Sequence, residues 1–165
     1  MRRGEKGFTL IETIISIAIM GIIMPVMAMT VITMLTNHQR ADNHNITLRE
    51  VRNVGYWISR DVQMAESVAL TAPGGFPLSL DIPVDTNSNN DYSVDYLFDG
   101  SNLKRQVHDS LGALVSERLI AGSIDAENTT FSSLDLNRYY LTVRASRGET
   151  TEERSCEVRN RLGSG

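Results

Sequence analysis

The sequence predicts an α+β fold, in which one long N-terminal helix is followed by an antiparallel sheet of about four strands. Two observations carry this prediction. Residues 13–39 include no charged side chain, and no proline lies between Pro25 and Pro73, so a helix can continue well beyond the apolar stretch. After Pro77, short segments of alternating polarity are separated by glycine and asparagine turns, which is typical of strands.

Charge is distributed unevenly along the 165 residues. The chain has 16 basic and 20 acidic residues and a formal net charge of −4. All but three of the basic residues and all but two of the acidic ones lie from Arg40 onward. The sequence therefore joins an apolar N-terminal segment to a polar domain, and its acidic balance gives no reason to expect a nucleic-acid partner.

The apolar segment is long enough to cross a membrane. Thr13 to Leu35 is 23 residues, which as a helix spans roughly 34 Å. The cations Arg2, Arg3 and Lys6 precede it, so we expect a cytoplasmic N-terminus and an exported C-terminal domain.

Three interpretations of this segment compete. It could be a secretory signal cleaved after Ala28, a plain membrane anchor, or a segment in which Glu12 has a specific role. The apolar run exceeds the roughly 7–15 residues of a secretory signal, and a carboxylate stands at its start, which argues against the first interpretation.

The run Lys6-Gly7-Phe8-Thr9-Leu10-Ile11-Glu12 resembles the N-terminal signal of type IV pilins and type II secretion pseudopilins. The resemblance implies that prepilin peptidase cuts after Gly7 and methylates Phe8, and that Glu12 becomes the fifth residue of the mature chain. It also implies a pilin-like organisation, with a leader at residues 1–7, a transmembrane and assembly helix at 8–36, and an exported globular domain at 37–165 that includes the second half of the helix.

Glu12 is the candidate assembly residue. Cleavage after Gly7 would create an α-amino group four residues away, roughly 6 Å along a helix. When helices pack with an axial stagger, the carboxylate of one subunit can pair with the ammonium of a neighbour, and leaving either charge alone in a low dielectric costs several kcal/mol. We expect this salt bridge to set the register of assembly. The alternative is a carboxylate at the membrane interface without a partner.

The second half of the helix is predicted to be amphipathic. Apolar residues recur at three- and four-residue steps, and charged residues, Arg60 and Asp61 among them, occupy mostly other faces. The predicted stripe consists of Leu48, Val51, Val54, Ile58, Val62, Ala65 and Val68. We therefore expect one helix from about residue 8 to about residue 69, with this stripe against the sheet.

Strands are predicted after a loop at residues 72–77. Residues 92–98 and 103–107 form a hairpin across the turn at 99–102, and residues 113–120 form a further strand. Residues 138–145 and 154–161 form a terminal hairpin, whereas the pattern at 124–135 favours no structure.

Looser similarities concern the kind of subunit. The run Tyr56-Trp57-Ile58-Ser59-Arg60-Asp61-Val62-Gln63 and the ending Val158-Arg159-Asn160-Arg161 resemble J-type pseudopilins and W-type minor pilins. The presence of Glu12 argues against the K-type tip subunit, which typically lacks that residue.

Together these similarities imply a minor structural subunit that is not an enzyme. It would reside in the cytoplasmic (inner) membrane as a single-pass protein and then enter a filament. The implied partners are prepilin peptidase, homologous pilin or pseudopilin subunits, the inner-membrane assembly platform, and membrane lipid before assembly.

One loop suggests a different chemistry. Asp85, Asn87, Asn89 and Asp91 have the alternate oxygen ligands of a calcium loop, although Asn90 replaces the turn glycine and Tyr96 stands where the bidentate glutamate belongs. The alternative hypothesis is therefore a membrane-anchored extracytoplasmic binding module or adhesin, dependent on calcium. A solvated loop explains the same residues, and no other cofactor is expected.

Catalytic patterns are absent from the sequence. His38, His44 and His108 lack the spacing of a helical metal pair, and there is no nucleophile elbow or phosphate-binding glycine loop. The single cysteine, Cys156, rules out a disulfide within this chain, and we expect it to be a small buried residue of a strand.

Overall fold

A computed structural model describes residues 9–71, 74–84 and 91–161 of the chain. It divides into two compact units, Met1–Ala41 and Asp42–Gly165. Helix α1, Leu10–Met64, contributes residues to both units. It continues without a break past Pro25 and past the asparagines that follow the apolar segment. The predicted boundary at residues 36/37 stays a prediction.

Eight strands follow α1 in the described part of the chain. They are β1 (Ser67–Leu70), β2 (Leu78–Ile82), β3 (Tyr92–Asp99), β4 (Asn102–His108), β5 (Leu114–Ala121), β6 (Thr130–Asp135), β7 (Arg138–Arg147) and β8 (Thr150–Arg159). Strands β1 to β5 form one sheet in chain order and β6 to β8 form a second, and every neighbouring pair is antiparallel. The α+β class is confirmed, but the expected sheet of about four strands is two sheets of five and three.

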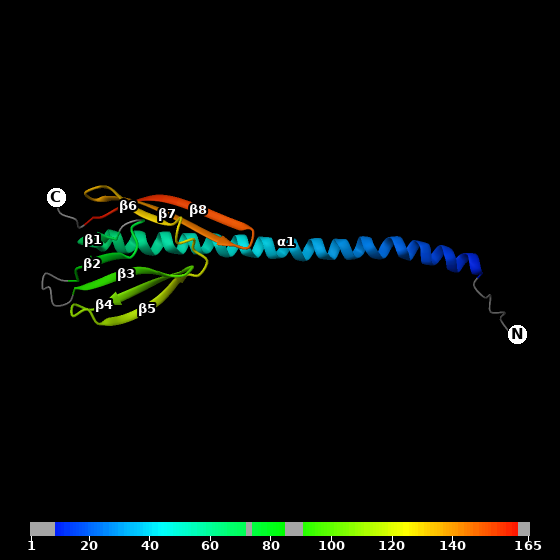
Figure 1. Cartoon of the computed structure of the whole chain (residues 1–165), viewed down its shortest axis with the longest axis horizontal. Coiled ribbons are helices and arrows are strands. Elements are labelled where there is room, and N and C mark those ends of the chain that lie inside the picture. The colour runs from blue at the N-terminus through cyan, green and yellow to red at the C-terminus, as the bar shows by residue number, and fades with distance from the viewer. Residues whose placement is uncertain (1–8, 72–73, 85–90, 162–165) are drawn as a thin grey trace. The chain divides into compact units, whose positions relative to one another are not determined.

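Within the globular unit, the second half of α1 lies between the two sheets (Figure 1). Its buried stripe includes Val51, Val54, Ile58 and Val62, each at most 1% exposed. These side chains share one hydrophobic cluster with residues of both sheets, among them Leu80, Tyr96, Leu103, Phe131, Leu141 and Val143. The predicted role of the stripe is therefore confirmed.

The helix ends five residues earlier than predicted. Ala65 donates its N–H to Val62 O at 3.3 Å, and Glu66 already donates to Asp81 O of β2 at 2.8 Å. Residues 67–70 then pair with β2 as β1, so the last member of the predicted stripe, Val68, belongs to a strand. The ladder with β2 satisfies the backbone there, and this long-range pairing overrides the helical spacing of the apolar residues.

The predicted hairpins are confirmed. Strands β3 and β4 pair from Ser93↔His108 to Asp99↔Asn102, and Gly100 at the turn has φ +61°, a conformation that favours glycine. Strands β7 and β8 pair over their whole length, and Gly148 at their turn also has φ +61°. Strand β5 agrees with the prediction for 113–120, whereas β1, β2 and β6 were missed.

The position of Asp61 corrects a second expectation, namely that this charged residue lies on a face of the helix away from the core. Its residue is fully buried, and its Oδ2 accepts hydrogen bonds from Tyr96 Oη of β3 at 2.5 Å and Arg105 Nε of β4 at 2.6 Å. The carboxylate therefore links α1 to the centre of the five-stranded sheet, because its charge needs donors once water is excluded.

This cluster shifts the pKa of both partners. Burial, together with the adjacent carboxylate, raises the pKa of the Tyr96 phenol well above its usual value, so the phenol stays neutral and donates. Burial disfavours the charge of Arg105, but the hydrogen bond and charge of Asp61 outweigh this and raise its pKa.

We predict that a fragment beginning at Asn37 is soluble and folded. It lacks the apolar segment but keeps the stripe and both sheets, which together supply a core of their own. Circular dichroism should show mixed helix and strand. A disordered or purely helical spectrum would contradict this fold.

Replacing Tyr96 with Phe in that fragment should lower the free energy of unfolding by about 1–3 kcal/mol, because a buried carboxylate loses one of its donors. Tyr56→Phe is the matched control, since Tyr56 is 60% exposed, and should change stability by less than about 0.5 kcal/mol. Urea titration measures both.

The same pair of variants tests the phenol's pKa. A raised pKa means that the stabilisation is fully present below the unfolded tyrosine pKa of about 10 and is lost as the pH rises above it. Wild type should therefore lose more stability than Tyr96→Phe between about pH 9 and pH 11. Equal losses would show that the Tyr96 phenol does not contribute.

Candidate functional site: the N-terminal processing and assembly segment

The predicted cleavage and methylation residues, Gly7 and Phe8, lie outside the described residues. Thr9 is the first described residue and immediately precedes α1. Thr9 O accepts hydrogen bonds from Glu12 N at 3.1 Å and Thr13 N at 3.2 Å, and Thr9 Oγ1 accepts from Glu12 N at 3.4 Å. Thr9 is therefore the N-cap of the helix, with glutamate at the third helical position, as in a capping box.

The N-cap was missed from the sequence, although the pattern Thr-Xaa-Xaa-Glu before an apolar run is its usual signature. The cap fixes Glu12 in the first turn of α1. There its carboxylate lies near the positive end of the helix dipole, an interaction of typically 0.3–1 kcal/mol in exposed helices. Within the described residues, no ion pair joins Glu12 to another side chain.

The surface of α1 around and beyond Glu12 is apolar on all sides. An 18-residue window of α1 has a mean hydropathy of 2.4, and none of it is buried within the described structure. Even the large apolar residues are exposed, for example Leu10 at 80%, Ile22 at 70% and Met29 at 72%. A helix that is hydrophobic all round must be covered by lipid or by other helices.

Five hydroxyl side chains of this segment are satisfied within the helix. Their hydroxyls donate to backbone carbonyls three or four residues earlier, so they place no free donor in hydrocarbon. The residues are Thr13, Ser16, Thr30, Thr33 and Thr36, with oxygen–oxygen distances of 2.8 to 3.3 Å.

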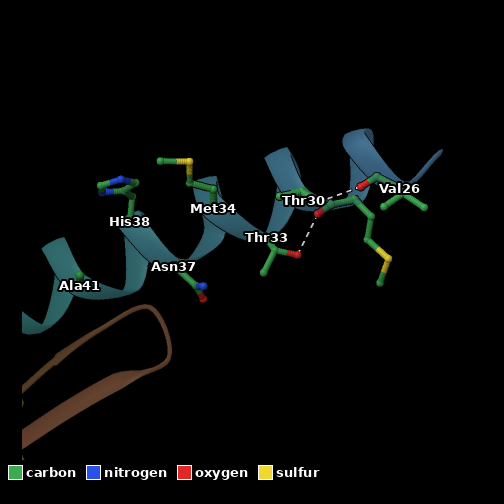
Figure 2. A pocket seen from close by; sticks show the side chains of 8 residues that line it. Val26, Thr30, Thr33, Met34, Asn37, His38 and Ala41 are labelled. Carbon is green, nitrogen blue, oxygen red and sulfur yellow. Dashed lines mark hydrogen bonds between the residues drawn. The ribbon is translucent and has the colours of Figure 1, made fainter. Parts of the chain in front are cut away.

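Figure 2 shows the C-terminal end of this segment, where side chains of α1 line a shallow open hollow. Thr30 Oγ1 donates to Val26 O at 2.9 Å and Thr33 Oγ1 donates to Met29 O at 2.8 Å. Its lining is mostly methyl and thioether groups, with the polar side chains of Asn37 and His38 toward the end at Ala41. The change from apolar to polar side chains along one helix is what a helix leaving a membrane requires.

The predicted calcium ligands Asp85, Asn87 and Asn89 lie outside the described residues. The fourth, Asp91, accepts a hydrogen bond through Oδ1 from Val84 N at 3.2 Å. The Tyr96 hydroxyl is bonded to Asp61 and is fully buried, so it does not serve as the ligand that a calcium loop has at that position. In the part of the chain that the structure describes, no three His, Cys, Asp or Glu side chains come together as a metal site. Calcium binding by the loop stays a prediction.

Cys156 is exposed in β8, which corrects the expectation that it is buried. Of the predicted histidines, His44 Nδ1 lies 2.9 Å from Glu152 Oε1, and His108 Nδ1 lies 3.3 Å from Asp95 Oδ2. The contacts of these two histidines are thus with single carboxylates on the globular unit.

Comparison with known proteins gives one match. Residues 2–24 match the family model described as the prokaryotic N-terminal methylation motif. No curated protein and no solved structure matches the chain. The chain thus carries the prepilin-type cleavage and methylation signal of type IV pilins and pseudopilins, and the predicted resemblance is confirmed for the segment that includes Gly7, Phe8 and Glu12.

Proposed function

We propose, from the prepilin-type signal that this chain carries, that it is a minor pilin or pseudopilin of a type IV pilus or a type II secretion-like filament. The signal supports a pilin-like substrate of prepilin peptidase that anchors in the inner membrane and assembles with other pilin subunits. It favours a structural subunit over an enzyme. Cleavage after Gly7 and methylation of Phe8 would precede assembly through α1.

The observation that carries the proposal is an apolar helix that begins within the matched signal and has one carboxylate in its first turn. Between Thr9 and Gln39, Glu12 is the only Asp, Glu, Lys or Arg. Its side chain has no ion pair among the described residues, and the helix around it has no protein cover. Lipid covers such a surface before assembly, and neighbouring helices cover it in a filament.

The energetics give Glu12 a specific task. An acidic residue at the centre of a membrane helix costs about 2.5–3.5 kcal/mol on insertion scales, and less near the interface. The helix dipole offsets only a part of that cost. In a filament without lipid headgroups or water, a neighbour's α-ammonium is the partner that the processing reaction itself supplies.

The cations Arg2, Arg3 and Lys6 support a cytoplasmic N-terminus and an exported globular unit. The inner-membrane assembly platform would then extract the subunit from lipid. A minor role, like that of J-type or W-type subunits, is supported by the run from Tyr56 to Gln63.

Co-expression with prepilin peptidase should remove Met1 to Gly7 and leave a methylated Phe8. Intact-mass analysis of the membrane-extracted protein measures both changes together. A Gly7→Leu variant is the control and should stay full-length, because the enzyme cuts after the glycine. Recovery of only the full-length wild-type chain, or cleavage after Ala28, would contradict the proposal.

Replacing Glu12 with Gln or Ala should leave membrane insertion unchanged or easier, and cleavage should persist, since the scissile bond is untouched. Association with partner subunits should fall by about two to four decades, because an unpaired ammonium in the filament core costs about 3–5 kcal/mol. Crosslinking with partner pilins in membranes measures association, and processing is checked in the same sample.

Ser16→Ala is the matched control, because Ser16 lies one turn away and its Oγ donates to Glu12 O at 2.8 Å. It should assemble like wild type. A Glu12 variant that is processed and joins its partners at wild-type levels would show that Glu12 is an interfacial carboxylate only.

A further inference from the structure

Three arginines surround one indole on the globular unit. The guanidinium carbons of Arg118, Arg105 and Arg60 lie 5.0, 5.3 and 5.6 Å from the centre of the Trp57 ring. They come from β5, β4 and α1, so the fold brings together residues that are far apart in the sequence. Each distance is within the roughly 6 Å of a cation–π contact.

The charges of this arginine–tryptophan cluster are not balanced. Arg105 is paired with Asp61, and its side chain is 15% exposed. Arg60 and Arg118 are exposed, and no carboxylate of the described residues forms an ion pair with either. Two unneutralised cations beside a third, in a chain with a net charge of −4, make a local anion-attracting patch.

Buried contacts hold part of the cluster in place. Asp61 binds Arg105 at 2.6 Å and is itself fully buried, while Trp57 is partly buried on the same helix and packs edge-on against Tyr56. The indole and one guanidinium are therefore fixed before any ligand arrives, which reduces the entropy lost on binding.

The neighbouring strand points to a peptide rather than a free anion. Strand β5 ends the five-stranded order, so one of its edges has no strand partner in the described chain. On the face of this strand opposite to Arg118, Leu119 is 56% and Val115 is 65% exposed. An open edge with exposed apolar side chains is a surface to which an extended segment can add.

From these observations, we propose that the arginine–tryptophan cluster and the adjacent edge of β5 form a docking site for an acidic, extended peptide segment of a partner protein. Carboxylates of the segment would pair with Arg60 and Arg118, and its backbone would lie along β5. This surface belongs to the globular unit and is separate from Glu12, so the proposal does not depend on filament assembly.

The chain supplies its own probe, because Trp57 is its single tryptophan. Full-length protein in an uncharged detergent is titrated with hexaglutamate while tryptophan emission is followed. We expect a saturable change at low ionic strength that weakens strongly at about 0.5 M salt, where exposed charges are screened. Absence of a saturable change at millimolar peptide would overturn the proposal.

The double variant Arg60→Gln with Arg118→Gln should weaken hexaglutamate binding by about tenfold or more. Arg52→Gln with Arg147→Gln is the matched control, since both residues are exposed, the variant loses the same charge, and neither residue is among the three arginines over the Trp57 ring. The control should bind like wild type. Calorimetric titration is used for the variants, because Arg60 and Arg118 also set the emission of the free protein, and circular dichroism checks their folding.

Equal loss in the two double variants would show a general charge effect and overturn the site. Inorganic phosphate distinguishes the ligand class. If phosphate at the same charge concentration binds as tightly as hexaglutamate, the cluster is a simple anion site and the docking of a peptide is wrong.

Discussion

The structure of the globular unit depends on one helical stripe packed between two sheets. Val51, Val54, Ile58 and Val62 are at most 1% exposed and share one core with residues of both sheets. Connecting segments beside the five-stranded sheet also bond to the three-stranded sheet, since Phe131 of β6 donates its N–H to Gly74 O at 2.8 Å and Ile124 forms an isolated bridge with Ala145 of β7. Gly75 allows this approach, because a Cβ added there would lie 1.9 Å from Phe131 O. Removing the stripe would leave both sheets with an uncovered apolar face.

Polar side chains of α1 also hold the helix against the five-stranded sheet at the edge of the core. Glu50 Oε1 accepts from Gly122 N at 3.1 Å, and Asn53 Nδ2 donates to Ile120 O at 3.3 Å. These bonds satisfy backbone groups at the end of β5, next to the buried stripe. The second bond also shows why this half of the helix tolerates Asn53, since asparagine weakens an isolated helix but here binds a strand.

Sequence patterns predicted the parts that depend on local spacing. The glycine turns predicted the β3–β4 and β7–β8 hairpins, and the apolar residues at three- and four-residue steps predicted the stripe. The same spacing predicted Val68 wrongly as helical, because the pairing of β1 with β2 depends on residues that are distant in the sequence. Strand β2 was missed although Leu78, Leu80 and Ile82 alternate with polar residues, since Pro77 and Pro83 on either side suggested a loop. Asp61 could not be placed, because its donors are 35 and 44 residues away in the chain.

Asp61 and Glu12 are two carboxylates on one helix with opposite means of satisfying their charge. Asp61 is buried and finds Tyr96 and Arg105 within its own chain, so its role ends in the fold. Glu12 lies in an apolar segment with no ion-pair partner among the described residues. A charge that must leave water needs a counter-charge, and the described residues of this chain provide none for Glu12. This difference is why we assign architecture to Asp61 and propose assembly for Glu12, although both stand in the same helix.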